Sequence, residues 1–295
     1  MNVTFNLSLK ENTMKKFFIL SIFVFSAFVL VACGGGRDEE VLRVGMDLRF
    51  PPFETEAADG TPLGISVDVA MAFGEFLGRE VEIVNTNFAS LIPSLNAGEI
   101  DIIIASMSNT PARAETIDFS ETYFYFKIPS LVNRTFAEAN GLTEDSSTED
   151  ILAIEGARFT GVTGQISASY PESLGLTVEI ATNLEAAVLN VVQGQADVLM
   201  MSTFPVVRGH LANEEDTIVI WEPWQSSPIA MGVVQGNDEL LAQANDFIAS
   251  LDQPGGLYDE LREKWDVSNL NTADWDPAII LVLDRFGLDF FINED

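Results

Sequence analysis

Small hydroxyl side chains and a single arginine follow a short isoleucine-rich run in the first half of the chain. Ser106 and Ser108 come directly after the run, and Arg113 lies five residues further on. A guanidinium group presents a planar fork of N–H donors that matches a carboxylate through two parallel hydrogen bonds. We therefore expect Arg113 to bind a carboxylate supplied by a small ligand. The alternative is a surface ion pair with Glu115 or Asp118.

A second candidate anion site is the stretch 161–167, which reads GVTGQIS. It follows a predicted strand and precedes a predicted helix. Backbone N–H groups at a helix N-terminus attract a carboxylate. Gln165, Ile166 and Ser167 are therefore candidate ligand contacts, with an ordinary glycine turn as the alternative.

The elements that must position these residues alternate along the chain from residue 41. Strand candidates are 41–46, 81–86, 101–106, 158–162, 177–181 and 196–202. Helix candidates are 65–78, 88–98, 167–175 and 183–195. This alternation predicts parallel sheets with helices on their faces. In such open sheets, ligands sit outside the carboxyl ends of the strands, which is where the arginine and the hydroxyl cluster are expected.

The strand–helix rhythm occurs twice, which predicts two similar lobes. In each copy an aspartate opens a buried strand after a helix end, Asp101 in AGEID and Asp197 in GQAD, and we expect both aspartates to be structural. Two long stretches without helical period, 122–132 and 223–234, predict two chain crossings. A cleft between the lobes and hinges at the crossings follow from this arrangement.

The N-terminal segment has the pattern of a secretory signal. Two lysines precede an apolar run that ends at Ala32, and Met14 is the expected translation start. The LVAC motif that ends at Cys33 resembles the bacterial lipobox, which implies cleavage before this cysteine and attachment of lipid to it. We expect a signal peptide over 1–32 and a flexible, lipid-anchored tether over 33–40. A retained membrane helix is the alternative.

Acidic residues dominate the charge of the chain. It has 45 aspartates and glutamates against 15 lysines and arginines, which gives a formal net charge of −30. A negative charge of this size argues against nucleic acid as a partner, because the phosphates are also negative. It suits a salty medium, where screening reduces the repulsion between the acidic side chains. The one histidine, His210, and the one cysteine form no cluster of common metal ligands. We expect no metal site and no cofactor.

The chain resembles the extracytoplasmic solute-binding proteins of the polar amino-acid uptake family, solute-binding protein family 3. Six segments carry the resemblance: RVGMDLRFPPFE (43–54), DGTPLGISVDVAMAFGEFLG (59–78), FASLIPSLNAGEIDIIIASMSNTPAR (88–113), IDFSETY (117–123), GQADVLM (194–200) and GLYDELREKW (256–265). The resemblance implies an α/β, two-lobed periplasmic-binding-protein-like fold of type II. Such a protein closes on a small ligand and delivers it to an ABC transporter.

The resemblance also implies domain boundaries. Lobe 1 is expected at 41–127 and 228–266, and lobe 2 at 128–227. Residues 267–295 form a C-terminal extension, in which an apolar helix starting at Pro277 is expected to pack on lobe 1. A contact with a partner chain is the alternative for this extension.

The resemblance assigns roles to residues of the expected cleft. Arg113 would clamp the ligand's α-carboxylate, with the serine hydroxyls beside it. Phe50 and Phe88 match positions whose rings face the ligand from opposite sides, although phenylalanines are core residues by default. Asp47 matches a position that reads the distal end of the ligand, with a strand-end cap as the alternative.

The chain departs from the family at Ser202. The family usually places an aspartate there, which pairs with the ligand's α-ammonium group. A hydroxyl accepts a hydrogen bond but does not neutralise a cation. Either another acid, such as Asp47, does so, or the ligand is not a simple α-amino acid.

Three classes of function fit these observations. The leading one is a lipid-anchored binding protein of an ABC importer, which captures an amino acid or related small carboxylate and has the permease subunits and the membrane as partners. An enzyme on the same scaffold, such as a dehydratase or a lytic transglycosylase module, needs an acid–base pair in the cleft, and the sequence shows none. A sensory input module would have a later membrane span or signalling domain, which is not expected after residue 266.

Overall fold

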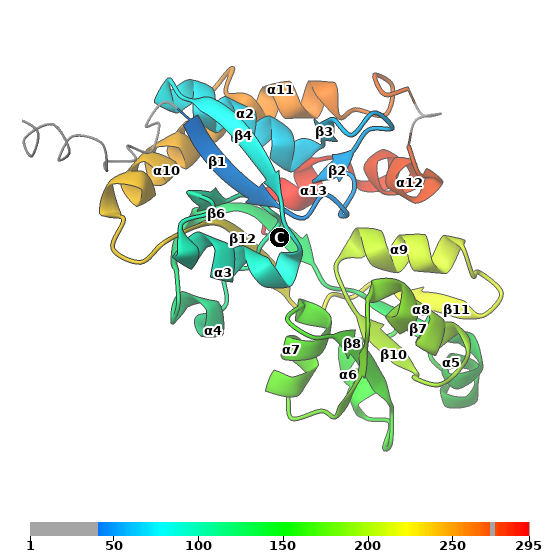
Figure 1. Ribbon diagram of the computed structural model, residues 1–295. Coiled ribbons are helices and arrows are strands. Elements are labelled where there is room, and N and C mark those ends of the chain that lie inside the picture. Colours follow the sequence, from blue (N-terminus) through cyan, green and yellow to red (C-terminus); the bar gives the residue numbers. More distant parts are fainter. Residues whose placement is uncertain (1–40, 272–274, 295) are drawn as a thin grey trace, which may run out of the picture. The chain divides into compact units, whose positions relative to one another are not determined.

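The computed structural model describes residues 41–271 and 275–294, and two five-stranded sheets organise this part of the chain (Figure 1). The predicted signal peptide, Met14, Cys33 and the tether lie outside the described residues. The chain from Val41 onward forms one compact unit. We call the part built on the first sheet lobe 1 and the part built on the second sheet lobe 2.

The first sheet combines parallel and antiparallel strands. Its order is β4 (Glu80–Asn85), β1 (Val41–Met46), β5 (Ile102–Ile103), β12 (Ser226–Val233) and β6 (Asp118–Lys127). β1 is parallel to β4 and β5, with Val44 paired to both Ile83 and Ile102. β12 runs antiparallel to both β5 and β6. A small hairpin of β2 (Thr55–Glu56) and β3 (Pro62–Leu63) lies outside this sheet.

The second sheet repeats this plan. Its order is β9 (Val178–Ala181), β8 (Phe159–Val162), β10 (Val198–Met200), β7 (Ser130–Asn133) and β11 (Thr217–Ile220). β8 is parallel to β9 and β10, whereas β7 is antiparallel to β10 and β11. The two sheets therefore share one pattern of strand directions, and their three parallel strands share one order, which agrees with the two similar lobes predicted from the sequence.

Two crossings connect the lobes, as predicted. The first leads from β6 to β7 through Ile128 and Pro129, and the second leads from β11 to β12 through residues 221–225. The crossings are hydrogen-bonded to each other: the Ile128 N–H donates to the carbonyl of Gln225 at 3.1 Å, and the Trp224 N–H donates to the carbonyl of Ile128 at 3.0 Å. The relative angle of the lobes is therefore set at a narrow, two-stranded connection.

Helices cover both sheets, and several begin or end at residues that cap them. Those of lobe 1 are α2 (Ile65–Leu77), α3 (Leu91–Ala97), α4 (Pro111–Ala114), α10 (Asp238–Leu251) and α11 (Leu257–Lys264), with the 3-10 turn η2 (Phe88–Ser90). Those of lobe 2 are α5 (Arg134–Asn140), α6 (Thr148–Leu152), α7 (Ile166–Ser173), α8 (Leu184–Val192) and α9 (Thr203–Leu211). Gly78 ends α2 with a φ of 67°, a left-handed conformation that suits glycine. Asn183 caps α8 by accepting from the Ala186 N–H. No described helix is long and apolar enough to span a bilayer.

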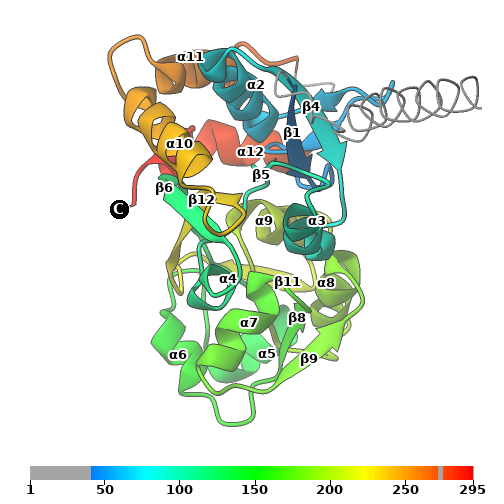
Figure 2. The same ribbon diagram turned by 60° about the vertical axis from the view of Figure 1, so that its left-hand side comes forward.

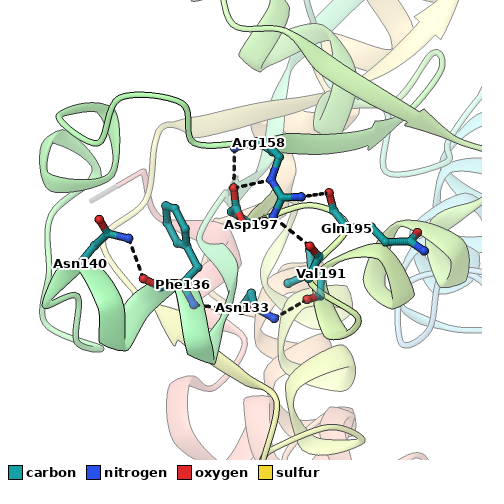
Figure 3. A network of polar contacts seen from close by, with 8 residues as sticks. Asn133, Phe136, Asn140, Arg158, Val191, Gln195 and Asp197 are labelled. Atoms are coloured by element: carbon teal, nitrogen blue, oxygen red, sulfur yellow. Dashed lines mark hydrogen bonds and ion pairs between the residues drawn. The ribbon is translucent and has the colours of Figure 1, made fainter.

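Asp101 and Asp197 are structural, as predicted, and they occupy equivalent places in the two lobes. Asp197 accepts hydrogen bonds from the Arg158 backbone N–H and guanidinium, and a further arginine N–H reaches the carbonyl of Gln195 (Figure 3). Asp101 accepts the same set from Arg43. Each aspartate thus ties the start of its own strand to the neighbouring parallel strand.

The C-terminal extension departs from the prediction. α13 (Asp289–Ile292) contacts β6 of lobe 1, but α12 (Pro277–Phe286) lies against α9 of lobe 2 (Figure 1). Four apolar residues of α12 at helical spacing are buried: Ala278, Ile279, Val282 and Leu283. Because this stripe needs an apolar partner and α9 provides one, the extension reaches both lobes rather than lobe 1 alone.

Candidate ligand-binding site

A cavity of about 690 Å³ is lined by residues of both lobes. Nine of the ten predicted ligand contacts line it: Asp47, Phe50, Phe88, Ser106, Ser108, Arg113, Gln165, Ile166 and Ser202. Ser167 is fully buried and is not part of the lining. The cavity therefore lies where the predicted cleft was expected.

The strand order explains why residues so distant in sequence meet here. Asp47 follows β1, Ser106 comes shortly after β5, Thr163 follows β8 and Ser202 comes shortly after β10. The carboxyl ends of parallel strands lie at one edge of a sheet, which is where open α/β sheets bind ligands. These edges of the two sheets both contribute to the lining.

Arg113 lies on α4. The N-cap of this helix is Thr110, and the Thr110 hydroxyl accepts a hydrogen bond from the Arg113 backbone N–H. The Arg113 Nη1 donates to the carbonyl of Ser108 at 2.8 Å, and its Nη2 donates to the carbonyl of Gly164, in lobe 2, at 2.9 Å. α4 and α7 accordingly lie next to each other across the two lobes (Figure 2). The guanidinium is held in place by neutral carbonyl groups.

No acidic side chain neutralises Arg113 within the described part of the chain. Burial lowers its pKa to about 10, with no contribution from a carboxylate. Its guanidinium lies 5.3 Å from the ring centroid of Phe88, within the range of a cation–π contact. Asp118 instead accepts from the Gly236 N–H at 3.0 Å. The expected alternative, a surface ion pair with Glu115 or Asp118, is not formed.

Asp47 is already engaged by protein groups. Its carboxylate pairs with Arg49 at 2.8 Å and accepts from the Phe88 backbone N–H at 3.0 Å. These bonds agree with a capping role for Asp47 and occupy both of its oxygens. Its capacity to neutralise a ligand's ammonium group is reduced accordingly.

Glu54 is a buried acid of the cavity lining that reasoning from sequence did not single out. Its residue is 2% exposed, and burial raises the pKa of its carboxyl to about 8, while the Ser106 hydroxyl donates to it at 2.9 Å and opposes the shift. Ser66 lies close to the same carboxyl, although its hydroxyl forms no hydrogen bond of ordinary geometry with the described residues. Ser106 itself has a φ of 51°, a strained value for a non-glycine residue. The signal available in the sequence was an acidic residue directly after FPPF (50–53).

Phenylalanines form one wall of the cavity. Phe50 lies 6.1 Å from Phe53 and 6.0 Å from Phe126 between ring centroids, and both Phe50 and Phe126 line the cavity. Phe53 is fully buried and belongs to the core. Phe88 reaches the cavity from η2, beneath the Arg113 guanidinium.

The turn between β8 and α7 brings Gln165 and Ile166 to the lining. Gly161 makes this possible, because a side chain there would come within 2.2 Å of the Ser167 carbonyl oxygen. The Ser167 hydroxyl accepts from the Val162 N–H at 3.1 Å. Ser167 thus closes the turn from inside, which explains why it does not face the cavity.

Comparison with known proteins agrees with this architecture. Residues 42–268 match the family model of the bacterial extracellular solute-binding proteins, family 3. The chain belongs to this family.

Similar proteins of this family bind amino acids. The chain is 23% identical over 263 residues to the arginine-binding extracellular protein ArtP of Bacillus subtilis (strain 168). This alignment covers 85% of this chain and 98% of the relative. A solved ancestral arginine-binding protein bound to arginine is 27% identical, with a TM-score of 0.63 over 78% of this chain and 99% of that one. The ancestral amino acid-binding protein AncCDT-1, a precursor of cyclohexadienyl dehydratase, is 26% identical, with a TM-score of 0.62 over 77% and 95%.

Two polar atoms of this family 3 protein are buried at the cavity without a partner among the described residues. They are the Ser202 hydroxyl and the Gln165 Oε1. A buried polar atom without a hydrogen bond is costly. Their position in the lining indicates that a ligand or water completes their hydrogen bonding.

Two tryptophans and the one histidine lie outside the cavity. Trp221 and Trp224 do not line the cavity, and the Trp224 indole N–H donates to the Ser130 hydroxyl at 2.6 Å beside the crossings. His210 lies 3.0 Å from the Thr217 hydroxyl. The described residues contain no cluster of His, Cys, Asp and Glu suited to a metal ion.

Proposed function

We propose that this protein captures an amino acid or a related small carboxylate in the cavity between its lobes and delivers it to an ABC importer. The observation that carries the proposal is the state of Arg113, a cation at the cavity with no acidic partner among the described residues. A guanidinium has five N–H donors, and protein carbonyls use two of them. The remaining donors are available to a carboxylate that comes with the ligand.

We further propose that the ligand's cationic end lies near Glu54, Ser202 and Gln165. Ser202 and Gln165 supply acceptors that have no partner in the described part of the chain, and Glu54 is the member of this set that can become negatively charged. The arginine-binding relatives favour a cationic amino acid. Glu54 would lose its proton when such a ligand binds, because the two opposite charges stabilise each other.

Thermal unfolding of the full chain against a panel of amino acids tests this proposal. A ligand present at about 100 times its dissociation constant adds about 2.7 kcal/mol of stability, and we expect arginine or lysine to raise the melting temperature. Arg113→Ala should abolish the shift.

Arg134→Ala is the matched control, since its guanidinium also donates to backbone carbonyls but does not line the cavity. It should lower the melting temperature without removing the ligand shift. The absence of a shift with every amino acid, or a shift that persists in Arg113→Ala, would refute the proposal.

Catalysis in the cavity is the second candidate. Glu54, with a pKa of about 8 in the cavity lining, has the character of a general acid, and one structural relative is a precursor of a dehydratase. Incubating the best ligand with the protein and following it by NMR separates the two functions. An unchanged spectrum supports binding alone, and a new product supports an enzyme.

We also propose that the protein is exported and held at the membrane by lipid on Cys33. The support is the signal-like segment with its LVAC motif and membership of an extracellular family. Several acyl chains on one residue hold firmly, because each buried methylene contributes about 0.8 kcal/mol. Phase separation in a cloud-point detergent should place the wild type in the detergent phase and Cys33→Ala in the aqueous phase.

A further inference from the structure

The last described segment of the chain, residues 275–294, lies beyond the region matched by the family model and touches both lobes. α12 lies against α9 of lobe 2, and α13 lies against β6 of lobe 1. After α11 the chain therefore contacts lobe 2 through α12 and then contacts lobe 1 again through α13 (Figure 1). The extension thus links the lobes in addition to the two crossings, the Arg113–Gly164 hydrogen bond and the direct contact of Phe53 with Phe204.

Phe291 is the centre of this link. It is 1% exposed, and its ring centroid lies 5.1 Å from that of Phe204, on α9. The same ring lies 5.3 Å from Phe53 and 5.8 Å from Phe126, both of lobe 1. One side chain of the extension thus packs against phenylalanines of both lobes, and two of these, Phe53 and Phe204, also contact each other with their ring centroids 5.7 Å apart.

Polar and aromatic contacts reinforce the link on both sides. Asp276, at the start of α12, pairs with Arg208 of α9 at 2.8 Å, and Asp289, on α13, pairs with Arg262 of α11 at 2.7 Å. Arg285 lies 4.5 Å from the ring centroid of Trp221, at the start of the second crossing. Exposed ion pairs contribute little, so the apolar contacts supply most of the stabilisation.

The link also lies close to the hinge and to the cavity. Phe126 precedes the first crossing by two residues, lines the cavity and contacts Phe291. A change of angle between the lobes must therefore break or slide the contacts of the extension with α9, with β6, or with both. Packed aromatic contacts of this kind hold discrete arrangements rather than deforming continuously.

We propose that residues 275–294 form a strap across the hinge that sets the balance between open and closed arrangements of the lobes. The strap does not touch the ligand; it acts by stabilising the arrangement in which Phe53, Phe204 and Phe291 are packed together. A ligand that needs another lobe angle must overcome this packing, so the strap also tunes affinity. The effect on affinity rests on the proposed ligand-binding function, whereas the effect on the lobes does not.

Distances between spin labels on the two lobes test the proposal without a ligand. In the full chain with Cys33→Ser, labels are placed at Glu75→Cys on α2 and Glu172→Cys on α7, both exposed positions. Double electron–electron resonance then compares the native strap with Phe291→Ala. We expect Phe291→Ala to broaden or shift the distance distribution while the circular dichroism spectrum stays native.

Leu281→Ala is the matched control, because Leu281 lies on α12 but is 41% exposed. It should leave the distribution unchanged. If Phe291→Ala does not fold, Phe291→Leu, which keeps an apolar side chain, should cause a smaller change of the same kind. If Phe291→Ala or Phe291→Leu folds and gives the same distance distribution between the spin labels as the protein with the native strap, the proposal is wrong.

Arginine as a probe separates this proposal from the proposed function. If arginine binds, Phe291→Ala should change its dissociation constant at least threefold, and Leu281→Ala should not. An unchanged dissociation constant overturns the claim on affinity. If no amino acid binds the wild type, the proposed function fails, and the ligand-free distances still decide whether the strap controls the lobes.

Discussion

Arg113 and Glu54 are ionisable groups at the same cavity, and neither forms an ion pair with another described residue. Arg113 stays protonated at neutral pH, because burial lowers its pKa only to about 10. Glu54, with its pKa raised to about 8, holds a proton over most of the physiological range. The lining of the ligand-free cavity therefore contains a cation, Arg113, that is unpaired among the described residues, and an acid that becomes negative only when Glu54 ionises.

Glu54 should make stability depend on pH. Its carboxyl has a pKa of about 8 in the folded protein against 4.5 as the ordinary value. Between these values the folded protein keeps a proton that the unfolded chain has lost. The free energy of unfolding therefore falls as pH rises through this range, by at most about 1.4 kcal/mol per pH unit.

Urea unfolding of the wild type and Glu54→Gln measures this contribution. The wild type should lose stability relative to the variant between about pH 5 and about pH 8, because glutamine does not titrate. Parallel pH dependences of the two proteins would show that Glu54 is not the responsible group.

Ser202→Ala should separate binding from stability. The Ser202 hydroxyl is buried at the cavity and has no hydrogen-bond partner within residues 41–271 and 275–294. Its removal should therefore leave the ligand-free melting temperature unchanged or slightly higher. Loss of one hydrogen bond to the ligand should weaken binding by about 1 kcal/mol, or about fivefold. Ser226→Ala is the control, since that hydroxyl is also unpartnered but does not line the cavity. Equal ligand affinities in the two variants would contradict a contact with Ser202.

At the scale of elements, the two lobes are built around the same arginine–aspartate pair. Arg43 with Asp101 and Arg158 with Asp197 join equivalent parallel strands in each lobe. Burial alone would raise the pKa of Asp101, but hydrogen bonds from the Arg43 side chain and backbone outweigh it and lower that pKa. These pairs hold together the strands whose carboxyl ends supply the cavity.

Removal of either aspartate should destabilise the protein, and Asp197 should matter more. The Asp197 side chain is 6% exposed, against 15% for Asp101. Asp197→Ala removes the acceptor of the Arg158 backbone N–H, whereas the Arg158 guanidinium, which is 53% exposed, still donates to the carbonyls of Gln195 and Gly194. The cost should therefore be about 1–3 kcal/mol, mainly from the backbone N–H that loses its partner. Asp101→Ala should cost less.

Arg49→Ala is the control for these two variants, because it breaks a pair in which Arg49 is 69% exposed. It should lower the free energy of unfolding by no more than about 1 kcal/mol. Urea unfolding measures all three variants. If Asp197→Ala lowers the free energy of unfolding by no more than Arg49→Ala does, the Arg158–Asp197 pair has no structural role.

At the scale of the whole molecule, the formal net charge of −30 should make stability depend on salt. Like charges repel in the compact state, and the screening length falls from about 30 Å at 0.01 M to about 3 Å at 1 M ionic strength. We expect the free energy of unfolding to rise between dilute buffer and about 1 M sodium chloride. Potassium chloride should act equally if screening is the cause. No gain in stability with either salt would argue against adaptation to a salty medium.

Local patterns in the sequence were enough to predict much of this fold. The strand over 41–46, the end of α2 at Gly78 and the Asn183 cap depend on residues within a few positions of one another. The two crossings were predicted because the stretches 122–132 and 223–234 lack the periodicity of a helix. Such features need no knowledge of distant contacts, because hydrogen bonding and capping act over one or two turns.

The tertiary structure alone decided three further points. It showed that Glu54 shares the cavity with Arg113, that Ser167 is turned inward, and that the extension bridges both lobes through Phe291. Each depends on contacts between residues far apart in the chain, such as Phe204 with Phe291. Burial and the resulting shift of a pKa come from the whole fold, whereas a sequence determines directly only what neighbouring residues do to each other.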